Sequence, residues 1–258
     1  MWNRALAFSL WVTLAIPCVA LSQNLELKPD DPRVHGEYLQ PYTNEWRMKL
    51  VRPDGSVLED AGMWSDQLES MLVDGRSCWR RTQHATFKRS NGEIAATTKT
   101  VNVFDARSLR PLFREFERHI VGGDDSKLKI TFRNDSLKIE TTEHGQIEVR
   151  EPITSEAFDF YGGLYALLWV ALPLKAEFTA TFPSYTEDKH PENVQRVTYK
   201  IMGQEAIVAG RMGRQETWIV ESDTSIGHLK YWISEKAPYI VRMDFKDASG
   251  ANWTLSMT

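Results

Sequence analysis

From Gly36 onward, short segments in which apolar and polar residues alternate dominate the sequence, and turn residues separate them. Successive side chains of a β-strand point to opposite faces, so a period of two is typical of half-buried strands. Between residues 109 and 149 the alternation is interrupted at Gly122-Gly123-Asp124-Asp125, Asn134-Asp135 and His144-Gly145. This spacing predicts a meander of antiparallel strands with tight connections, and so a mainly β fold.

The same criteria predict about a dozen strands in all, with boundaries uncertain by a few residues. Apart from the short strands between the turns of residues 122–149, they are Glu45–Val51, Trp79–Lys88, Ile94–Phe104, Leu109–Ile120, Glu177–Phe182, Val194–Ile201, Glu205–Val208, Glu216–Glu221, Leu229–Ser234, Tyr239–Phe245 and Asn252–Met257. Gln23–His35 is polar and contains two prolines, so we expect an extended lead-in there rather than a packed element.

One segment, Phe158–Leu174, breaks the pattern. It has helical length, is rich in Ala and Leu, and is apolar on all sides, which predicts a buried helix. The simpler interpretation is a core helix packed on the sheet, and the alternative is a cover over a hydrophobic pocket. Asp159, near its start, is expected to cap the helix N-terminus rather than to act as a general acid or base.

The first 22 residues have the features of a secretory signal peptide. A positive Arg4 precedes the apolar run Ala5–Ile16, and Ala20-Leu21-Ser22 favours cleavage before Gln23. The run is too short for a membrane anchor, and the residues before Cys18 match a lipoprotein signal poorly. No later run is long enough to span a membrane either. We therefore expect residues 23–258 to form a single exported β-rich domain, with one candidate seam near residues 151–158.

Cleavage would leave Cys78 as the one cysteine of the exported chain, so no intramolecular disulfide could form. The favoured interpretation of Cys78 is a buried strand residue. A reactive thiol or an intermolecular bridge is the alternative, because Arg80 and Arg81 could favour a thiolate.

Composition and motifs exclude several function classes. The net charge of −4 argues against general nucleic-acid binding. The chain has no zinc-protease, nucleophile-elbow, phosphate-loop or dinucleotide motif, and its histidines lack metal-ligand spacing, so no cofactor or metal is expected. The basic stretch Arg76–Arg89 is interpreted as a solvated strand face.

Two phrases, Val103–Phe116 (VFDARSLRPLFREF) and Tyr231–Phe245 (YWISEKAPYIVRMDF), share an order of strand, polar connection, proline and strand. With the stretch from Asp159 to Pro183, they resemble a group of exported bacterial proteins that carry a domain of unknown function. The resemblance covers roughly Val103–Met257 and is weaker over Gln23–Asn102. The same phrase is loosely similar to the LolA/LolB-type periplasmic lipoprotein carriers. The resemblance implies a curved antiparallel sheet or unclosed β-barrel with residues 158–174 as its buried or covering helix, and a periplasmic location.

Three hypotheses for function follow. The first is a non-enzymatic module that binds a lipid or other apolar ligand in a curved β cavity. Its candidate ligand-binding residues are Phe158, Phe160, Tyr161, Leu164, Leu168 and Trp169. The second is a structural or interaction protein of the cell envelope with an envelope protein as partner. The third and least favoured is an envelope hydrolase that uses Asp159 with His190 or His228.

Overall fold

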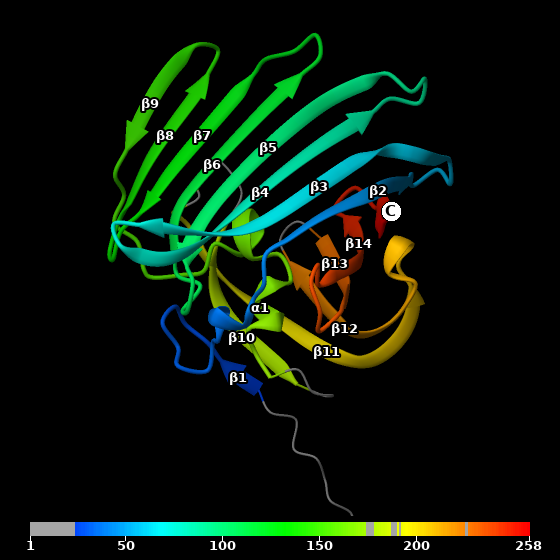
Figure 1. Cartoon of the computed structure of the whole chain (residues 1–258). Coiled ribbons are helices and arrows are strands. Elements are labelled where there is room, and N and C mark those ends of the chain that lie inside the picture. The colour runs from blue at the N-terminus through cyan, green and yellow to red at the C-terminus, as the bar shows by residue number, and fades with distance from the viewer. Residues whose placement is uncertain (1–23, 174–177, 187–189, 191, 225–226) are drawn as a thin grey trace, which may run out of the picture.

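The computed structural model describes residues 24–258 except 174–177, 187–189, 191 and 225–226, and of residues 161 and 162 it describes the backbone alone. Within these ranges, 15 strands form one sheet that is antiparallel apart from one short parallel pair. The sheet curves around two short helical segments, as an unclosed barrel does (Figure 1). The predicted fold class is therefore confirmed.

Strands β2 to β9 follow one another in chain order across one part of the sheet. They are β2 (Tyr42–Val51), β3 (Val57–Val73), β4 (Arg76–Lys88), β5 (Ile94–Asp105), β6 (Pro111–Ile120), β7 (Ser126–Phe132), β8 (Leu137–Glu143) and β9 (Gln146–Arg150). The predicted meander is confirmed. The sequence interpretation missed β3, which has 17 residues and is the longest of these strands.

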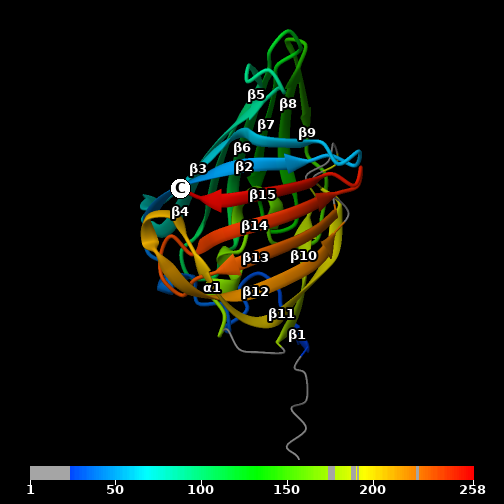
Figure 2. The same ribbon diagram turned by 90° about the vertical axis from the view of Figure 1, so that its right-hand side faces the viewer.

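The remaining strands form a second run, which Figure 2 shows stacked side by side. They are β1 (Asn24–Glu26), β10 (Thr179–Tyr185), β11 (Val194–Val208), β12 (Arg214–Thr224), β13 (Gly227–Ile233), β14 (Ile240–Asp247) and β15 (Asn252–Met257). Strand β15 pairs with β2 and joins the two runs, and β1 pairs in parallel with β10. The two strands predicted at Val194–Ile201 and Glu205–Val208 are one strand with a register shift between Ile201 and Gly203.

Register shifts help the sheet to curve, since an extra residue bends a strand and increases its twist. One shift lies between Met48 and Leu50 of β2, where β3 has extra residues between Leu58 and Gly62. Gly62 has φ +145°, and a Cβ there would lie 1.8 Å from the carbonyl oxygen of Thr86. Only glycine fits this bend, because the neighbouring backbone comes too close for any side chain.

The segment 151–158 connects the two far ends of the sheet. Ile153 pairs with Ser136 beside β8, whereas Phe158 pairs with Ser184 of β10. Phe132 and Tyr185 also meet across this junction, with ring centroids 5.3 Å apart. Backbone bridges and ring packing thus link the β8–β9 end of the sheet to β10, next to its other end, and within the described residues β9 and β10 do not pair directly.

The single long helix expected at 158–174 is instead two short pieces. Residues Phe160–Leu164 form a π-turn (η2), and Leu167–Val170 form a four-residue α-helix (α1). Between them Ala166 has φ +57°, a left-handed conformation that interrupts a right-handed helix. The segment is buried as predicted, but its helix is much shorter, and Leu174 lies outside the described residues.

The N-terminal segment packs more closely than its polarity suggested. Leu27, Val34 and Leu39 belong to the main hydrophobic core, and a 3-10 turn (η1, Gly36–Tyr38) follows. The indole N–H of Trp79 donates to the carbonyl of Gly36 at 3.0 Å. The expectation that Gln23–His35 is an unpacked lead-in is therefore wrong: its few apolar residues bury against the barrel.

A second 3-10 turn, η3 (Gly210–Met212), connects β11 and β12.

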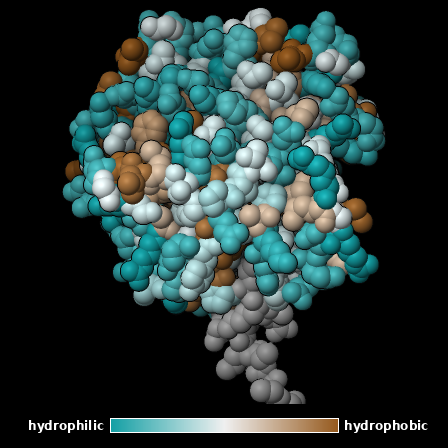
Figure 3. Space-filling view, viewed as in Figure 1, coloured by the Kyte–Doolittle hydropathy of each residue, from teal (hydrophilic) through white to brown (hydrophobic). Residues whose placement is uncertain are grey.

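The surface is of mixed character. Hydrophobic residues are scattered among hydrophilic ones on the face shown in Figure 3. In the part of the chain that the structure describes, no helix has the length and apolar character needed to cross a membrane.

Candidate functional site

The candidate ligand-binding residues from the sequence lie in the solid core. Phe158, Phe160, Leu164, Leu168 and Trp169 are at most 1% exposed. Phe160 and Trp169 pack against the rings of Phe182 and Tyr199 on β10 and β11. The side chain of Tyr161 lies outside the described residues. Ligand binding by this group stays a prediction, and none of its five described side chains lines the cavity described next.

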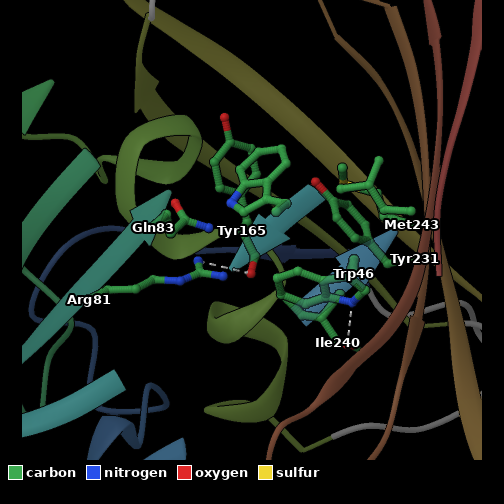
Figure 4. Close-up of a pocket in the computed structure, with 9 residues that line it drawn as sticks. Trp46, Arg81, Gln83, Tyr165, Tyr231, Ile240 and Met243 are labelled. Atoms are coloured by element: carbon green, nitrogen blue, oxygen red, sulfur yellow. Dashed lines mark hydrogen bonds between the residues drawn. The ribbon is translucent and has the colours of Figure 1, made fainter. Parts of the chain in front are cut away.

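A small cavity lies on the concave side of the sheet, between β4 and the β13–β15 strands (Figure 4). Its volume is about 20 Å³, within about 260 Å³ of space that includes the open approach to it. The enclosed part holds about one water molecule. The lining residues are mainly large and apolar or aromatic: Trp46, Trp64, Tyr165, Tyr231, Ile240, Met243 and Leu255, with Arg81 and Gln83 as polar members.

The two tryptophans of the cavity differ in their hydrogen bonding. The indole N–H of Trp46 donates to the carbonyl of Ile240 at 3.1 Å. The indole N–H of Trp64 is buried and has no hydrogen-bond partner among the described residues. The Trp64 ring meets Tyr165 edge-on at 6.2 Å. An unpaired buried donor costs about 1–3 kcal/mol, so an acceptor group entering beside Trp64 would relieve a real cost.

Arg81 forms the polar end of the cavity through a fully buried ion pair. Its Nε and Nη2 donate to the two carboxylate oxygens of Asp66 at 2.8 and 2.5 Å. The hydroxyl of Tyr42 donates to the same carboxylate at 2.7 Å. Burial disfavours the charge of Arg81, but the facing Asp66 outweighs it and raises the pKa of Arg81 above its usual value. Burial has the opposite effect on Tyr42: it raises the pKa of the hydroxyl well above its usual value, and the positive charge of Arg81 only partly opposes this.

Arg81 also fixes the position of the π-turn. Its Nη1 donates to the carbonyl oxygens of Gly163 at 2.8 Å and Tyr165 at 3.4 Å. These bonds satisfy carbonyl groups that a regular helix would pair with its own backbone. A buried cation therefore replaces helical hydrogen bonds, and it places Tyr165 at the cavity wall (Figure 4).

A second buried ion pair anchors the start of the same turn. Arg114 Nη1 donates to Asp159 Oδ1 at 2.7 Å, and the amide of Asn102 donates to Oδ2 at 3.0 Å. The side chain of Asp159 makes no capping hydrogen bond. The capping role predicted for Asp159 is therefore wrong, because Arg114 from β6 binds its carboxylate instead. The main-chain oxygen of Asp159 accepts bonds from Gly163 and Leu164.

The helical segment that these two ion pairs hold carries backbone strain at Ala166. Ala166 is fully buried with φ +57°, and the π-turn η2 ends two residues before it, at Leu164. Non-glycine residues in the left-handed region and π-turns occur preferentially at functional sites. The strained segment lies behind the cavity and contributes Tyr165 to its wall, which makes the cavity the best candidate site.

Sequence reasoning missed the part that Arg81 plays. The stretch Arg76–Arg89 was interpreted as solvated, yet Arg81 is completely buried. The signal was its phase: Arg81 shares a strand face with Trp79 and Ala85, both of which are buried, whereas Arg80 lies on the opposite face. The alternation of buried and exposed residues along β4 indicates that Arg81 points inward. Its partner Asp66, however, lies on β3, the strand that was not predicted.

Cys78 is buried on β4, as predicted for a structural strand residue. Burial, together with the nearby Asp105, raises the pKa of its thiol. A raised pKa opposes formation of the thiolate, so the reactive-thiol alternative loses its physical basis.

The residues proposed for a hydrolase are held in other interactions. Asp159 is bound to Arg114, whereas the Nδ1 atoms of His190 and His228 lie 3.2 and 2.9 Å from the carboxylates of Glu192 and Asp223. Both histidine side chains are exposed. No group of three or more His, Cys, Asp or Glu side chains suited to a metal ion occurs among the described residues.

Comparison with known proteins confirms one part of the resemblance, the one to a domain of unknown function. The model of a family described as a protein of unknown function, DUF3108, matches residues 73–256. The match begins at residue 73, well before the expected Val103, and so includes β4 with Arg81 and Cys78. No curated protein shows a significant match to the chain.

Proposed function

This chain belongs to the DUF3108 family of proteins of unknown function, and we propose that it is an exported, non-enzymatic module that binds an apolar ligand inside its curved sheet. The supporting observation is the cavity between Trp46, Trp64 and Tyr165, which has an aromatic lining and a polar end. Ligand pockets are mostly apolar, with a few placed polar groups that fix orientation. The signal-peptide features of residues 1–22 support the export of the protein.

The polar atoms of the cavity indicate the chemistry of the ligand. The charge of Arg81 is already balanced by Asp66, so the site offers no free positive charge to an anion. The unpaired indole N–H of Trp64 and the amide of Gln83 are neutral groups. The ligand is therefore an apolar body, such as an acyl chain, with an uncharged hydrogen-bond acceptor such as an ester carbonyl or a hydroxyl.

Binding requires the cavity to widen, because the enclosed space of about 20 Å³ holds only a water-sized group. Trp64, Tyr165 and Met243 are the half-buried members of the lining, and in our proposal they move outward to widen it. The strained backbone at Ala166 lies directly after Tyr165, so a shift of Tyr165 would relax an unfavourable conformation. We therefore propose that the ligand enters the cavity by displacing the side chain of Tyr165.

The experiment is native mass spectrometry of the protein purified from its own envelope, followed by solvent extraction and lipid analysis. We expect a bound species that organic solvent removes and that carries an acyl chain. A protein that arrives without lipid, and that binds no acyl probe after purification, would contradict the proposal.

A second candidate function, an interaction module of the cell envelope without a small ligand, is favoured by one observation. Among the described residues, strand β9 pairs with another strand on one side only, and it carries exposed apolar side chains. The buried Cys78 is a poor site for crosslinking a partner, so engineered cysteines on β9 are required.

A further inference from the structure

The edge of the sheet at β9 (Gln146–Arg150) is paired on one side only and carries exposed apolar side chains. Residues 146–150 pair with β8 on one side, and the pairing continues to Ile153, which lies opposite Ser136. On the other side no strand pairs with β9 among the described residues. Ile147, Val149 and Ile153 are 72%, 53% and 87% exposed. Natural sheets usually protect such an edge, because its free backbone groups can pair with another chain.

The register shows which backbone groups are free. A two-residue turn at His144-Gly145, with φ +51° and +76°, closes the β8–β9 hairpin, so Glu143 and Gln146 form a hydrogen-bonded pair. Hydrogen-bonded pairs alternate along an antiparallel ladder. The even-numbered residues therefore bond to β8, and Pro152 does so when its carbonyl accepts from the N–H of Leu137. The N–H and C=O groups of Ile147, Val149 and Glu151 point to the open side.

The sequence of this edge is complementary to itself. When two copies run antiparallel with Val149 opposite Val149, Glu148 of each copy lies opposite Arg150 of the other. A shift of two residues in one direction places Glu148 opposite Glu148. A shift in the other direction places Arg150 opposite Arg150. The register with Val149 opposite Val149 therefore brings opposite charges together. The two registers shifted by two residues place like charges opposite each other and are disfavoured.

We infer that β9 pairs with β9 of a second copy of this chain, antiparallel and with Val149 opposite Val149, so that the two sheets become continuous. The backbone groups of Ile147, Val149 and Glu151 supply the hydrogen bonds. In each copy Arg150 also contacts Glu148 at 3.4 Å and Glu192 at 2.9 Å, so the new Glu148–Arg150 pairs extend an existing ion-pair network. The interface is a single strand pair, so the dimer is a concentration-dependent one.

Engineered cysteines test the register directly in the full chain. In the inferred dimer the two Val149 Cα atoms lie about 5.5 Å apart, within the range of a disulfide. The two Ile147 Cα atoms are offset by four residues along the strand, about 14 Å, too far for a disulfide. We expect Val149→Cys to form a disulfide-linked dimer under mild oxidation and Ile147→Cys to form none. The parent protein controls for its own cysteines.

Sedimentation of the unmodified protein provides a second measurement that needs no cysteine. We expect the mass to rise toward twice that of the monomer with concentration, and Val149→Pro to stay monomeric. That substitution removes an N–H on the open side and leaves the bonds to β8 in place. A parent protein that is monomeric at every concentration would overturn the inference. So would equal crosslinking of the two cysteine variants, or crosslinking of Val149→Cys to a different protein alone. None of these outcomes depends on whether the cavity binds a ligand.

Discussion

Arg81 and Asp66 form a doubly hydrogen-bonded ion pair with both side chains fully buried. They extend from neighbouring strands, β4 and β3, toward the carbonyl groups of the π-turn. This pair is the connection between the sheet and the strained segment behind the cavity.

Removal of one partner should destabilise the protein strongly. Asp66→Leu leaves the buried charge of Arg81 without its counter-charge, and we expect a loss of about 3–5 kcal/mol of unfolding free energy. Replacement of both residues, as in Asp66→Leu with Arg81→Met, should cost less than the sum of the single changes. Urea denaturation of the four proteins in this cycle measures the coupling. Strict additivity would show that the two groups do not act as a pair.

The role of Asp159 can be separated from helix capping. Serine is as good an N-terminal cap as aspartate, but it cannot balance the charge of Arg114. If the ion pair is what matters, Asp159→Ser should cost about 3–5 kcal/mol of unfolding free energy, because Arg114 is then buried without a partner. Urea denaturation at neutral pH checks this. A loss below about 1 kcal/mol would favour the capping role instead.

Backbone strain at Ala166 predicts a stabilising substitution. Glycine adopts φ +57° without the steric cost that a Cβ imposes, so Ala166→Gly should raise the unfolding free energy by up to about 1 kcal/mol. The matched control is Ala171→Gly, at a position that is also buried but has φ −80°, where glycine should cost about 1 kcal/mol. Thermal and urea unfolding of both variants decide the matter. A similar loss in both would mean that Ala166 is not strained.

The pH dependence of stability should include a contribution from Asp31. Hydrogen bonds from the Arg33 side chain lower the pKa of Asp31 below its usual value, against the effect of burial. A carboxyl with a lower pKa in the folded state stabilises the protein above the unfolded pKa of about 3.9, and it loses this contribution as the pH falls through the folded pKa.

Asp31→Asn should therefore lower the unfolding free energy by about 1 kcal/mol at pH 7. The difference from the parent protein should shrink as the pH falls below about 4. Urea midpoints across this pH range provide the measurement. A difference that stays constant with pH would rule out the ion pair as its cause.

Local pattern explains why most strands could be predicted. The alternation in β5 to β9 and in β12 to β15 is set by residues close in sequence, and the structure follows it. Strand β3 was not predicted because Gly62 and Asp66 are buried there while Met63 is exposed, so the polarity of its residues does not follow their burial. The glycine at the bend (Gly62) and the buried carboxylate (Asp66) are both needed by the fold, and together they obscure the alternation of apolar and polar residues.

The site itself depends on contacts that local sequence does not contain. Composition predicted a helix at 158–174, but Arg81 and Arg114, from strands far away in the sequence, bind its carbonyls and Asp159 and hold a broken, strained segment instead. Arg81 was recognisable by its phase on β4. Its meaning required Asp66 and the cavity, which only the assembled sheet brings together.

The central claim, that the cavity binds an apolar ligand, is tested most directly by filling it. Met243 lines the cavity, whereas Val208 is 81% exposed near the end of β11. Titration of delipidated protein with a fluorescent acyl probe compares Met243→Trp with its matched control, Val208→Trp. We predict that Met243→Trp weakens probe binding by about tenfold or more, equivalent to about 1.4 kcal/mol, while Val208→Trp leaves it unchanged. Equal affinity in the two variants, or no binding by the parent protein, would contradict the account.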